Sequence, residues 1–408
     1  MIKRIAAIVF IFICTTIAWV ALGATIFSRI YSADGRLQEK VASSWGTAQT
    51  QAPPNATYQT MRLHSEDTIE NGHAITRQTQ ETVSVTLPLE SSRVDVALSL
   101  EHRQKGLLWY STYMVDFLGN YTFRNTSQKE ESVTLLLPFP ASQAVYDNLE
   151  IRVEGQAAPL NSSSGGVSAT VMVPAGKTVP IAFSYRSQGM GNWNYTFGTE
   201  VSQVRDFVLN MKTNFKDIDF PTETLSPTEK REIPGGWDLA WKYTNLLSGL
   251  HIGMTMPEKL QPGPLAGQIS FFAPVSLFFF FFLMFIITTL RGIDLHPMNY
   301  FFLAAAFFAF HLLMAYLVDH ISVHLAFVIC SIVSILLVVS YLRLVVGMRF
   351  AAVEAGTAQF IYLVLFSYAF FFKGFTGLAI TIGSIVTLFV VMQLTGRIKW
   401  ADKFTTKF

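Results

Sequence analysis

The stretch from Phe271 to Thr395 is almost continuously apolar. It holds five apolar runs of about 20 residues each, and only seven acidic or basic side chains interrupt them. A helix of about 20 residues matches the roughly 30 Å hydrocarbon core of a bilayer. One further apolar run, Ile5 to Phe27, opens the chain. The sequence therefore predicts six membrane-spanning helices. A segment of some 240 residues, polar in overall composition, lies between the first and the second.

The polar middle of the chain has the two-residue period of β-strands. Residues 82–87 and 94–100 alternate between apolar and polar side chains, and turns rich in Gly, Asn, Ser and Pro separate such runs. Many short strands at this spacing are typical of an antiparallel sandwich. The only cysteines, Cys14 and Cys330, lie in predicted membrane helices, so a disulfide framework is excluded here. We expect residues 50–215 to fold alone.

The predicted fold class is a membrane α + β protein. An antiparallel β-sandwich exterior domain is inserted between an N-terminal transmembrane helix and a C-terminal five-helix transmembrane bundle. The predicted boundaries are 1–30 for the anchor, 31–55 for an amphipathic helix and linker, 56–215 for the sandwich, 216–269 for a Pro/Gly-rich membrane-proximal collar, 270–396 for the bundle and 397–408 for a basic tail.

Two of these segments rest on local signals. Leu37, Val41 and Trp45 recur every four residues, which predicts a short amphipathic helix, with Asp34 as its N-cap and Gly46 as its stop. In the collar, Trp237, Trp241 and Tyr243 are interleaved with Pro and Gly, which suits the headgroup region. The alternative for these three aromatic residues is an extra strand of the sandwich.

The flanking charges predict the orientation in the membrane. The first apolar run is longer than the 7–15 residues of a signal-peptide core, so we interpret it as an uncleaved anchor rather than a signal peptide. Basic residues gather on one side of the six spans, and the opposite side has only Lys373 in its short loops. The basic residues are Lys3, Arg4, Arg291, Arg343, Arg349, Arg397, Lys399, Lys403 and Lys407. Both termini are therefore predicted to be cytoplasmic and the large domain periplasmic.

Three short patterns resemble one known family. Leu295-His296-Pro297-Met298-Asn299-Tyr300 opens the third span and Asp319-His320 closes it; Gly396 to Trp400 ends the chain's last span; and Ser44-Trp45-Gly46 with Gln49 follows the first. Together with the topology, these resemble the CreD family of bacterial inner-membrane, cell-envelope integrity proteins. The family continues its post-anchor segment with Gly-Pro, whereas this chain has residues 51–54 as Gln-Ala-Pro-Pro. The resemblance implies a Gram-negative inner membrane and a role in envelope homeostasis, and it supplies no catalytic residues.

Polar residues inside a membrane are candidate functional groups, because burying them in lipid is costly. Four of the eight histidines fall between His296 and His324. His311 lies near the bilayer centre, and His296 could share its face of the helix. The alternative for His311 is a neutral residue that fixes helix packing. Glu354 is expected either to extend to the membrane interface or to form an ion pair with nearby Arg349, and Gln359 to bond a neighbouring helix.

A second candidate cluster lies at the predicted periplasmic mouth of the bundle. If helix continued through them, His320 and His324 would share a face, and Asp319 could complete a metal site. Histidines there could instead sense pH, or all three residues could simply form a polar loop. We predict no metal and no cofactor.

The exterior domain has no recognisable catalytic constellation, and its basic residues are balanced by acids, which argues against nucleic-acid binding. The leading hypothesis is a non-enzymatic envelope-integrity protein whose sandwich engages an envelope protein or lipid, with the bilayer as its other partner. A transporter or channel for a small or lipidic solute is the alternative, and a membrane enzyme with a site at the outer mouth is the third.

Overall fold

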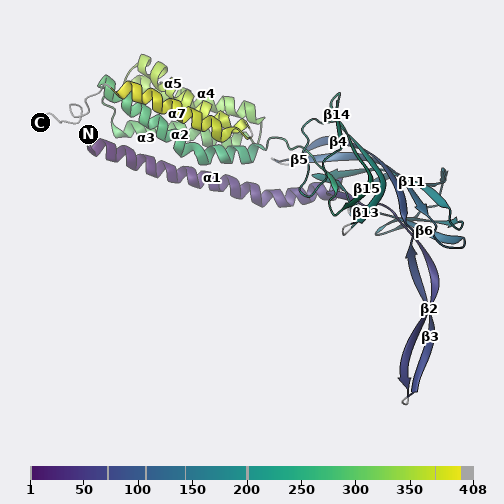
Figure 1. Cartoon of the computed structure of the whole chain (residues 1–408). Helices are drawn as coiled ribbons and strands as arrows, with labels where there is room; N and C mark the ends of the chain where they lie inside the picture. The colour runs from purple at the N-terminus through teal and green to yellow at the C-terminus, as the bar shows by residue number, and fades with distance from the viewer. Residues whose placement is uncertain are drawn as a thin grey trace. The chain divides into compact units, whose positions relative to one another are not determined.

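The computed structural model describes residues 2–70, 73–105, 108–142, 144–198, 202–372 and 374–396. The chain divides into two compact units (Figure 1). The helical unit comprises residues 1–36, 106–108 and 260–408, and the β unit comprises residues 37–105 and 109–259. The predicted tail, 397–408, and Lys373 lie outside the described residues.

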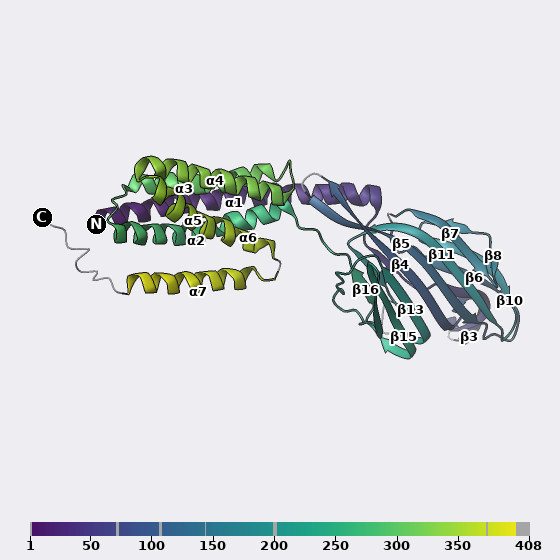
Figure 2. The same ribbon diagram turned by 90° about the horizontal axis from the view of Figure 1, so that it is seen from above.

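Six helices of the helical unit are long and apolar enough to cross a membrane, as the sequence predicted. They are α1 (Ile2–Trp45), α2 (Pro262–Arg291), α3 (Pro297–Leu317), α4 (Val323–Val345), the fifth span Phe350–Phe371, and α7 (Thr376–Thr395). The fifth span is the most buried of the six, whereas α1 and α7 are largely exposed. Figure 2 accordingly shows α7 at the outside of the bundle. Exposed apolar helix faces are what a bilayer requires.

The fifth span is not a regular α-helix. It consists of the π-helical segment η1 (Phe350–Ala355), α5 (Gly356–Gln359), a second π-helical segment η2 (Phe360–Leu365), α6 (Phe366–Tyr368) and the 3-10 turn η3 (Ala369–Phe371). π-Helical segments are rare and occur often at functional sites.

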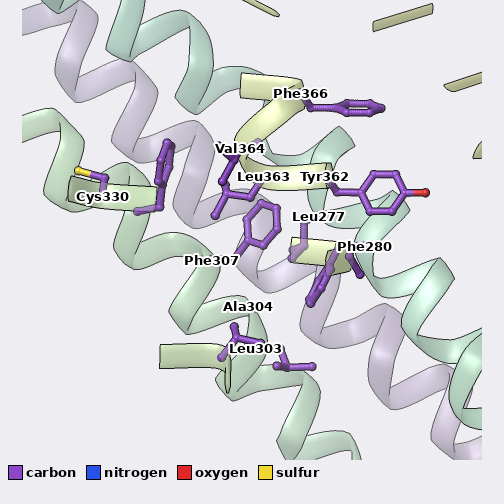
Figure 3. Close-up of a cluster of buried hydrophobic side chains, with 14 of the residues drawn as sticks. Leu277, Phe280, Leu303, Ala304, Phe307, Cys330, Tyr362, Leu363, Val364 and Phe366 are labelled. Carbon is purple, nitrogen blue, oxygen red and sulfur yellow. The ribbon is translucent and has the colours of Figure 1, made fainter. Parts of the chain in front are cut away.

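Aromatic and aliphatic side chains from neighbouring spans fill the centre of the bundle. Figure 3 shows Phe280 of α2, Phe307 of α3 and Leu363 of the fifth span in one cluster. All three are fully buried. The rings of Phe280 and Phe307 lie 5.6 Å apart. Van der Waals packing of this kind holds helices together where lipid is as apolar as the side chains.

The prediction of a separate amphipathic helix between Asp34 and Gly46, within the segment 31–55, is wrong. α1 runs without a break through Asp34 and ends at Trp45. Leu37 to Trp45 is therefore the last part of the first membrane helix. The predicted stop at Gly46 is confirmed: Gly46 has a φ of +117°, and a Cβ there would lie 2.4 Å from the carbonyl oxygen of Gln188. Only glycine fits such a position without strain.

The described residues of the β unit form three sheets. The eight-stranded sheet has the order β14 (Glu229–Ile233), β15 (Gly236–Ser248), β13 (Ser202–Thr213), β4 (Leu89–Lys105), β5 (Leu108–Arg124), β11 (Thr178–Met190), β7 (Tyr146–Val153) and β8 (Gln156–Ala157). The five-stranded sheet has the order β3 (His73–Thr86), β2 (Asn55–Glu70), β6 (Glu131–Pro138), β10 (Gly166–Val173) and β9 (Asn161–Ser163). The three-stranded sheet has the order β1 (Gln49–Gln51), β12 (Asn192–Tyr195) and β16 (Ile252–Thr255).

Most strand pairs are antiparallel, which confirms an antiparallel β domain; the sandwich itself stays a prediction. Among the described strands, two pairs are parallel, β4 with β13 and β1 with β12. One apolar core draws on all three sheets, for example through Leu135 of β6, Phe183 of β11 and Trp193 of β12. In Figure 1 the β2–β3 hairpin extends beyond the rest of this unit.

The membrane-proximal collar predicted for 216–269 is largely sheet. Trp237, Trp241 and Tyr243 lie in β15, so the alternative of extra strands is correct. Trp241 is fully buried in the core, and its Nε1 donates to the carbonyl oxygen of Leu225. The β unit consequently continues to about residue 259, and α2 begins at Pro262.

Candidate functional site

The deepest candidate residue, His311, is enclosed by aromatic rings of two helices. Its side chain is 1% exposed, and its ring lies 5.7 Å from that of Trp19 in α1 and 5.0 Å from that of Phe310. Nδ1 lies 3.1 Å from the carbonyl oxygen of Phe307. Because a carbonyl only accepts, Nδ1 carries the proton and Nε2 is left as an acceptor. Neither Nε2 nor the Nε1 of Trp19 has a hydrogen-bond partner among the described residues.

Gln359 links the irregular fifth span to its neighbours. Its Nε2 donates to Ser334 Oγ of α4 at 2.7 Å, and Ser334 Oγ donates to the carbonyl oxygen of Ala306 in α3 at 2.7 Å. The predicted bond from Gln359 to a neighbouring helix is thus confirmed. Gln359 and Ser334 are fully buried, and Gln359 Oε1 has no partner within the described part of the chain.

Glu354 forms an ion pair, but with a different arginine from the one we predicted. Arg291, the last residue of α2, donates from Nη2 to Glu354 Oε1. The expected partner, Arg349, is close in sequence, whereas the actual one comes from the end of another span. The side chain of Glu354 is mostly buried, and that of Arg291 is half exposed. This pair joins α2 to the fifth span.

His296 does not join His311 in one site. It is exposed and caps α3, where its Nδ1 accepts a hydrogen bond from the backbone N–H of Met298 at 3.2 Å. Fifteen residues separate the two histidines, which is roughly 22 Å along a helix. His296 therefore has a structural task of its own, the satisfaction of a free helix-terminal donor.

The three residues of the predicted mouth cluster point to different partners. Asp319 pairs with Arg29 of α1, at 3.4 Å. His320 is exposed in the turn, and the ring of His324 lies 5.0 Å from that of Phe371. α3 ends at Leu317 and α4 begins at Val323, so no single helix brings the two histidines onto one face. Within the described ranges, no three His, Cys, Asp or Glu side chains are grouped as metal ligands.

Besides Arg291, sequence reasoning missed Trp19, Arg29 and Ser334 as partners of the candidate residues. Arg29 donates to the carbonyl oxygen of Ala315 at 3.0 Å as well as pairing with Asp319. A lone tryptophan inside the first apolar run, and an arginine at its end, were the available signals. Neither signal predicts the partner residue, because the contacts of Trp19 with His311 and of Arg29 with Asp319 join residues almost 300 positions apart.

Sequence reasoning also missed a polar hollow on the eight-stranded sheet. Two open pockets, about 560 and 590 Å³ in volume, adjoin at Leu118 and Ser184, which line both. The first contains the ion pair of Arg186 with Asp116, at 2.6 Å. The second contains the pair of Arg152 with Glu150, at 2.8 Å. Strand alternation predicts only that these side chains point away from the core.

Comparison with known families gives one match. Residues 266–401 match the family model described as inner membrane protein CreD. The helical part of this chain is therefore similar to the CreD family. The resemblance drawn from residues 295–300 and 319–320 is thereby confirmed, and the CreD match together with six candidate spans supports a multi-pass inner-membrane protein. The match covers about a third of the chain and leaves the β unit outside it.

Other comparisons add little to the CreD match. A comparison with curated proteins found no match. Among solved structures, a putative nutrient binding protein from Legionella pneumophila is similar with 11% identity and a TM-score of 0.30, over 48% of this chain and 74% of that one. An M1 zinc metallopeptidase from Deinococcus radiodurans has 10% identity and a TM-score of 0.27, over 41% of this chain and 42% of that one. Likeness this low carries no functional argument.

Proposed function

We propose that this CreD-like chain is a non-enzymatic inner-membrane protein that supports the integrity of the bacterial cell envelope through a periplasmic β domain. The observation that carries the proposal is the polar hollow on the eight-stranded sheet. Two arginine–carboxylate pairs, Arg186 with Asp116 and Arg152 with Glu150, lie on its open face. Such a face suits binding of another envelope component.

The orientation that this proposal requires follows from the short loops. Arg291 ends α2, and Arg343 lies in the last turn of α4. Short loops rich in Lys and Arg face the cytoplasm. With six spans, both termini then lie in the cytoplasm and the β unit lies in the periplasm. A reporter fused after Phe408 should report cytoplasm and one inserted at Ser163 should report periplasm; a periplasmic signal at Phe408 contradicts the topology.

The binding role is tested by reversing charges in the hollow. In a strain that lacks the protein and is scored for sensitivity to envelope stress, Arg152→Glu combined with Arg186→Glu should fail to restore resistance. Arg231→Glu is the matched control, because Arg231 is also exposed and paired, with Asp238 at 2.6 Å, but lines neither pocket. Full restoration by the double variant, at equal protein level, contradicts the proposal.

One observation favours a transporter as the second candidate. Gln359 lies between the two π-helical segments of the fifth span and has an unpaired, fully buried oxygen. Irregular spans with polar groups at mid-membrane are typical of solute sites in transporters. If Gln359→Leu fails to restore resistance while the double variant of the hollow succeeds, the transporter becomes the better interpretation.

A further inference from the structure

An apolar groove separates α1 from α2 along part of their length. Its volume is about 530 Å³, and every residue that lines it is apolar. The lining residues are Ile5, Ile8, Val9, Phe12 and Ile13 of α1, and Phe278, Phe281, Phe282 and Phe285 of α2. Both walls lie inside candidate membrane spans. The groove is therefore an apolar site within the bilayer.

Outside the groove, α1 and α2 approach each other closely at glycines. Away from the groove, a phenylalanine ring of each helix packs against a glycine of the other helix. A Cβ on Gly23 would lie 2.9 Å from the ring of Phe271, and one on Gly267 would lie 2.9 Å from the ring of Phe27. Small residues allow close approach of membrane helices. Along the groove, bulky side chains occupy both helices, and the rings of Phe12 and Phe278 lie 6.2 Å apart across it.

The length and the end of the groove match one leaflet of a bilayer. Ile5 to Ile13 extends about 12 Å along α1, and half of the hydrocarbon core is about 15 Å. Arg4 directly precedes Ile5, and its Nη1 lies 2.9 Å from Asp294 Oδ1 in the turn after α2. Charged side chains of this kind lie at the membrane surface. The groove thus begins at headgroup level and continues toward the bilayer centre.

We propose that the groove binds one acyl chain of an anionic membrane phospholipid, whose phosphate lies at the level of Arg4. A pocket without polar lining atoms does not hold ordered water, and lipid chains are the apolar molecules in contact with it. The rings of Phe278 and Phe282 stack 6.1 Å apart along one wall and offer a continuous apolar surface. The side chain of Asp294 is 92% exposed and that of Arg4 is 21% exposed, with Nε and Nη2 buried, so a phosphate can share only Nη1 of Arg4 with Asp294. This proposal does not depend on what the β unit binds.

The test uses the full-length protein in mild detergent, with phosphatidylglycerol titrated and bound lipid counted by native mass spectrometry. Val9→Phe places a ring in the groove, whereas Val20→Phe places the same ring elsewhere on α1; both valines are 49% exposed. We expect one tightly bound lipid on the wild type and on Val20→Phe. Val9→Phe should weaken this binding on the order of tenfold, the effect of losing two buried methylene groups. Equal binding by both variants overturns the proposal.

A second variant tests the headgroup contact without changing the groove. Arg4→Gln should weaken binding of phosphatidylglycerol several-fold, yet leave binding of a diacylglycerol with the same chains equal to that of the wild type. Unchanged binding of phosphatidylglycerol by Arg4→Gln contradicts the phosphate contact. Equal loss of both lipids also contradicts the phosphate contact, because a diacylglycerol has no phosphate for Arg4 to bind. An unaltered melting temperature shows that either variant is folded.

Discussion

The boundary of the β unit gives the sharpest test of the fold. We expected residues 50–215 to fold alone, but β15 and β16 lie beyond this segment and contribute to the same core. A fragment ending at residue 215 loses five side chains that are at most 1% exposed: Leu239, Trp241, Ile252, Met254 and Met256. Burying each is worth roughly 1.5–3 kcal/mol, so the loss is about 8–15 kcal/mol as an upper limit. A whole domain is stable by only about 5–15 kcal/mol.

We therefore expect the fragment 37–259 to unfold in one cooperative urea transition, and the fragment 50–215 to show none. The longer fragment also keeps Gln49, whose Nε2 donates to Ser187 Oγ and to the carbonyl oxygen of Gln188, both at 2.8 Å. Far-ultraviolet circular dichroism against urea concentration measures both fragments. A cooperative transition of the shorter fragment at the same midpoint as the longer one would refute the assignment of β15 and β16 to the core.

Three further predictions concern single sites. Gly46→Ala should destabilise the β unit by roughly 1–3 kcal/mol and lower its melting temperature, because φ is +117° there and the added Cβ would lie too close to a backbone carbonyl oxygen of β11. Gly35→Ala is the control: its Cβ would meet nothing within 4 Å, so the melting temperature should not fall. Burial raises the pKa of Tyr121 and Tyr185, so the folded state favours their neutral phenols. The stability of the β unit should therefore hold below about pH 10, where the unfolded phenols are also neutral, and fall above it. An unfolding midpoint that stays constant from pH 9 to pH 11 contradicts this. His311→Leu should change stability in detergent by at most about 1 kcal/mol, since it removes one modest hydrogen bond and one unpaired acceptor; a stable variant that fails to restore envelope resistance would favour the transporter.

Membrane spans and strands could be predicted from the sequence because their signals are local. Length and hydropathy identify a span, and a two-residue period identifies a strand. The same logic was available for the predicted collar, where residues 237, 239, 241 and 243 are all apolar at that period. We predicted a collar there instead, because the segment is rich in Pro and Gly. The predicted break at Asp34 failed for a related reason: a capping residue can start a helix, but it does not stop one that is already formed.

Partners distant in the sequence could not be predicted. Glu354 has an arginine five residues away, yet it pairs with Arg291 of another span. Asp319 could equally have been a metal ligand, and it pairs with Arg29 instead. In both cases the composition of the site suggested the chemistry, an ion pair or a metal. Only the packing of α1, α2 and α3 determined which charge lies within reach.

The residues that carry the CreD resemblance have mainly structural tasks in this chain. His296 caps α3, Asp319 pairs with α1, and Gln49 is buried against β11. Recurrence of such residues in a family follows from folding alone and does not locate an activity. The unpaired Oε1 of Gln359 and Nε2 of His311 have no comparable folding explanation, whereas the sheet hollow places its ion pairs on an open face. A buried polar group without a partner lowers stability, so its presence calls for a functional reason. Variants at those sites, rather than in the family motifs, are therefore the ones that separate the two proposed functions.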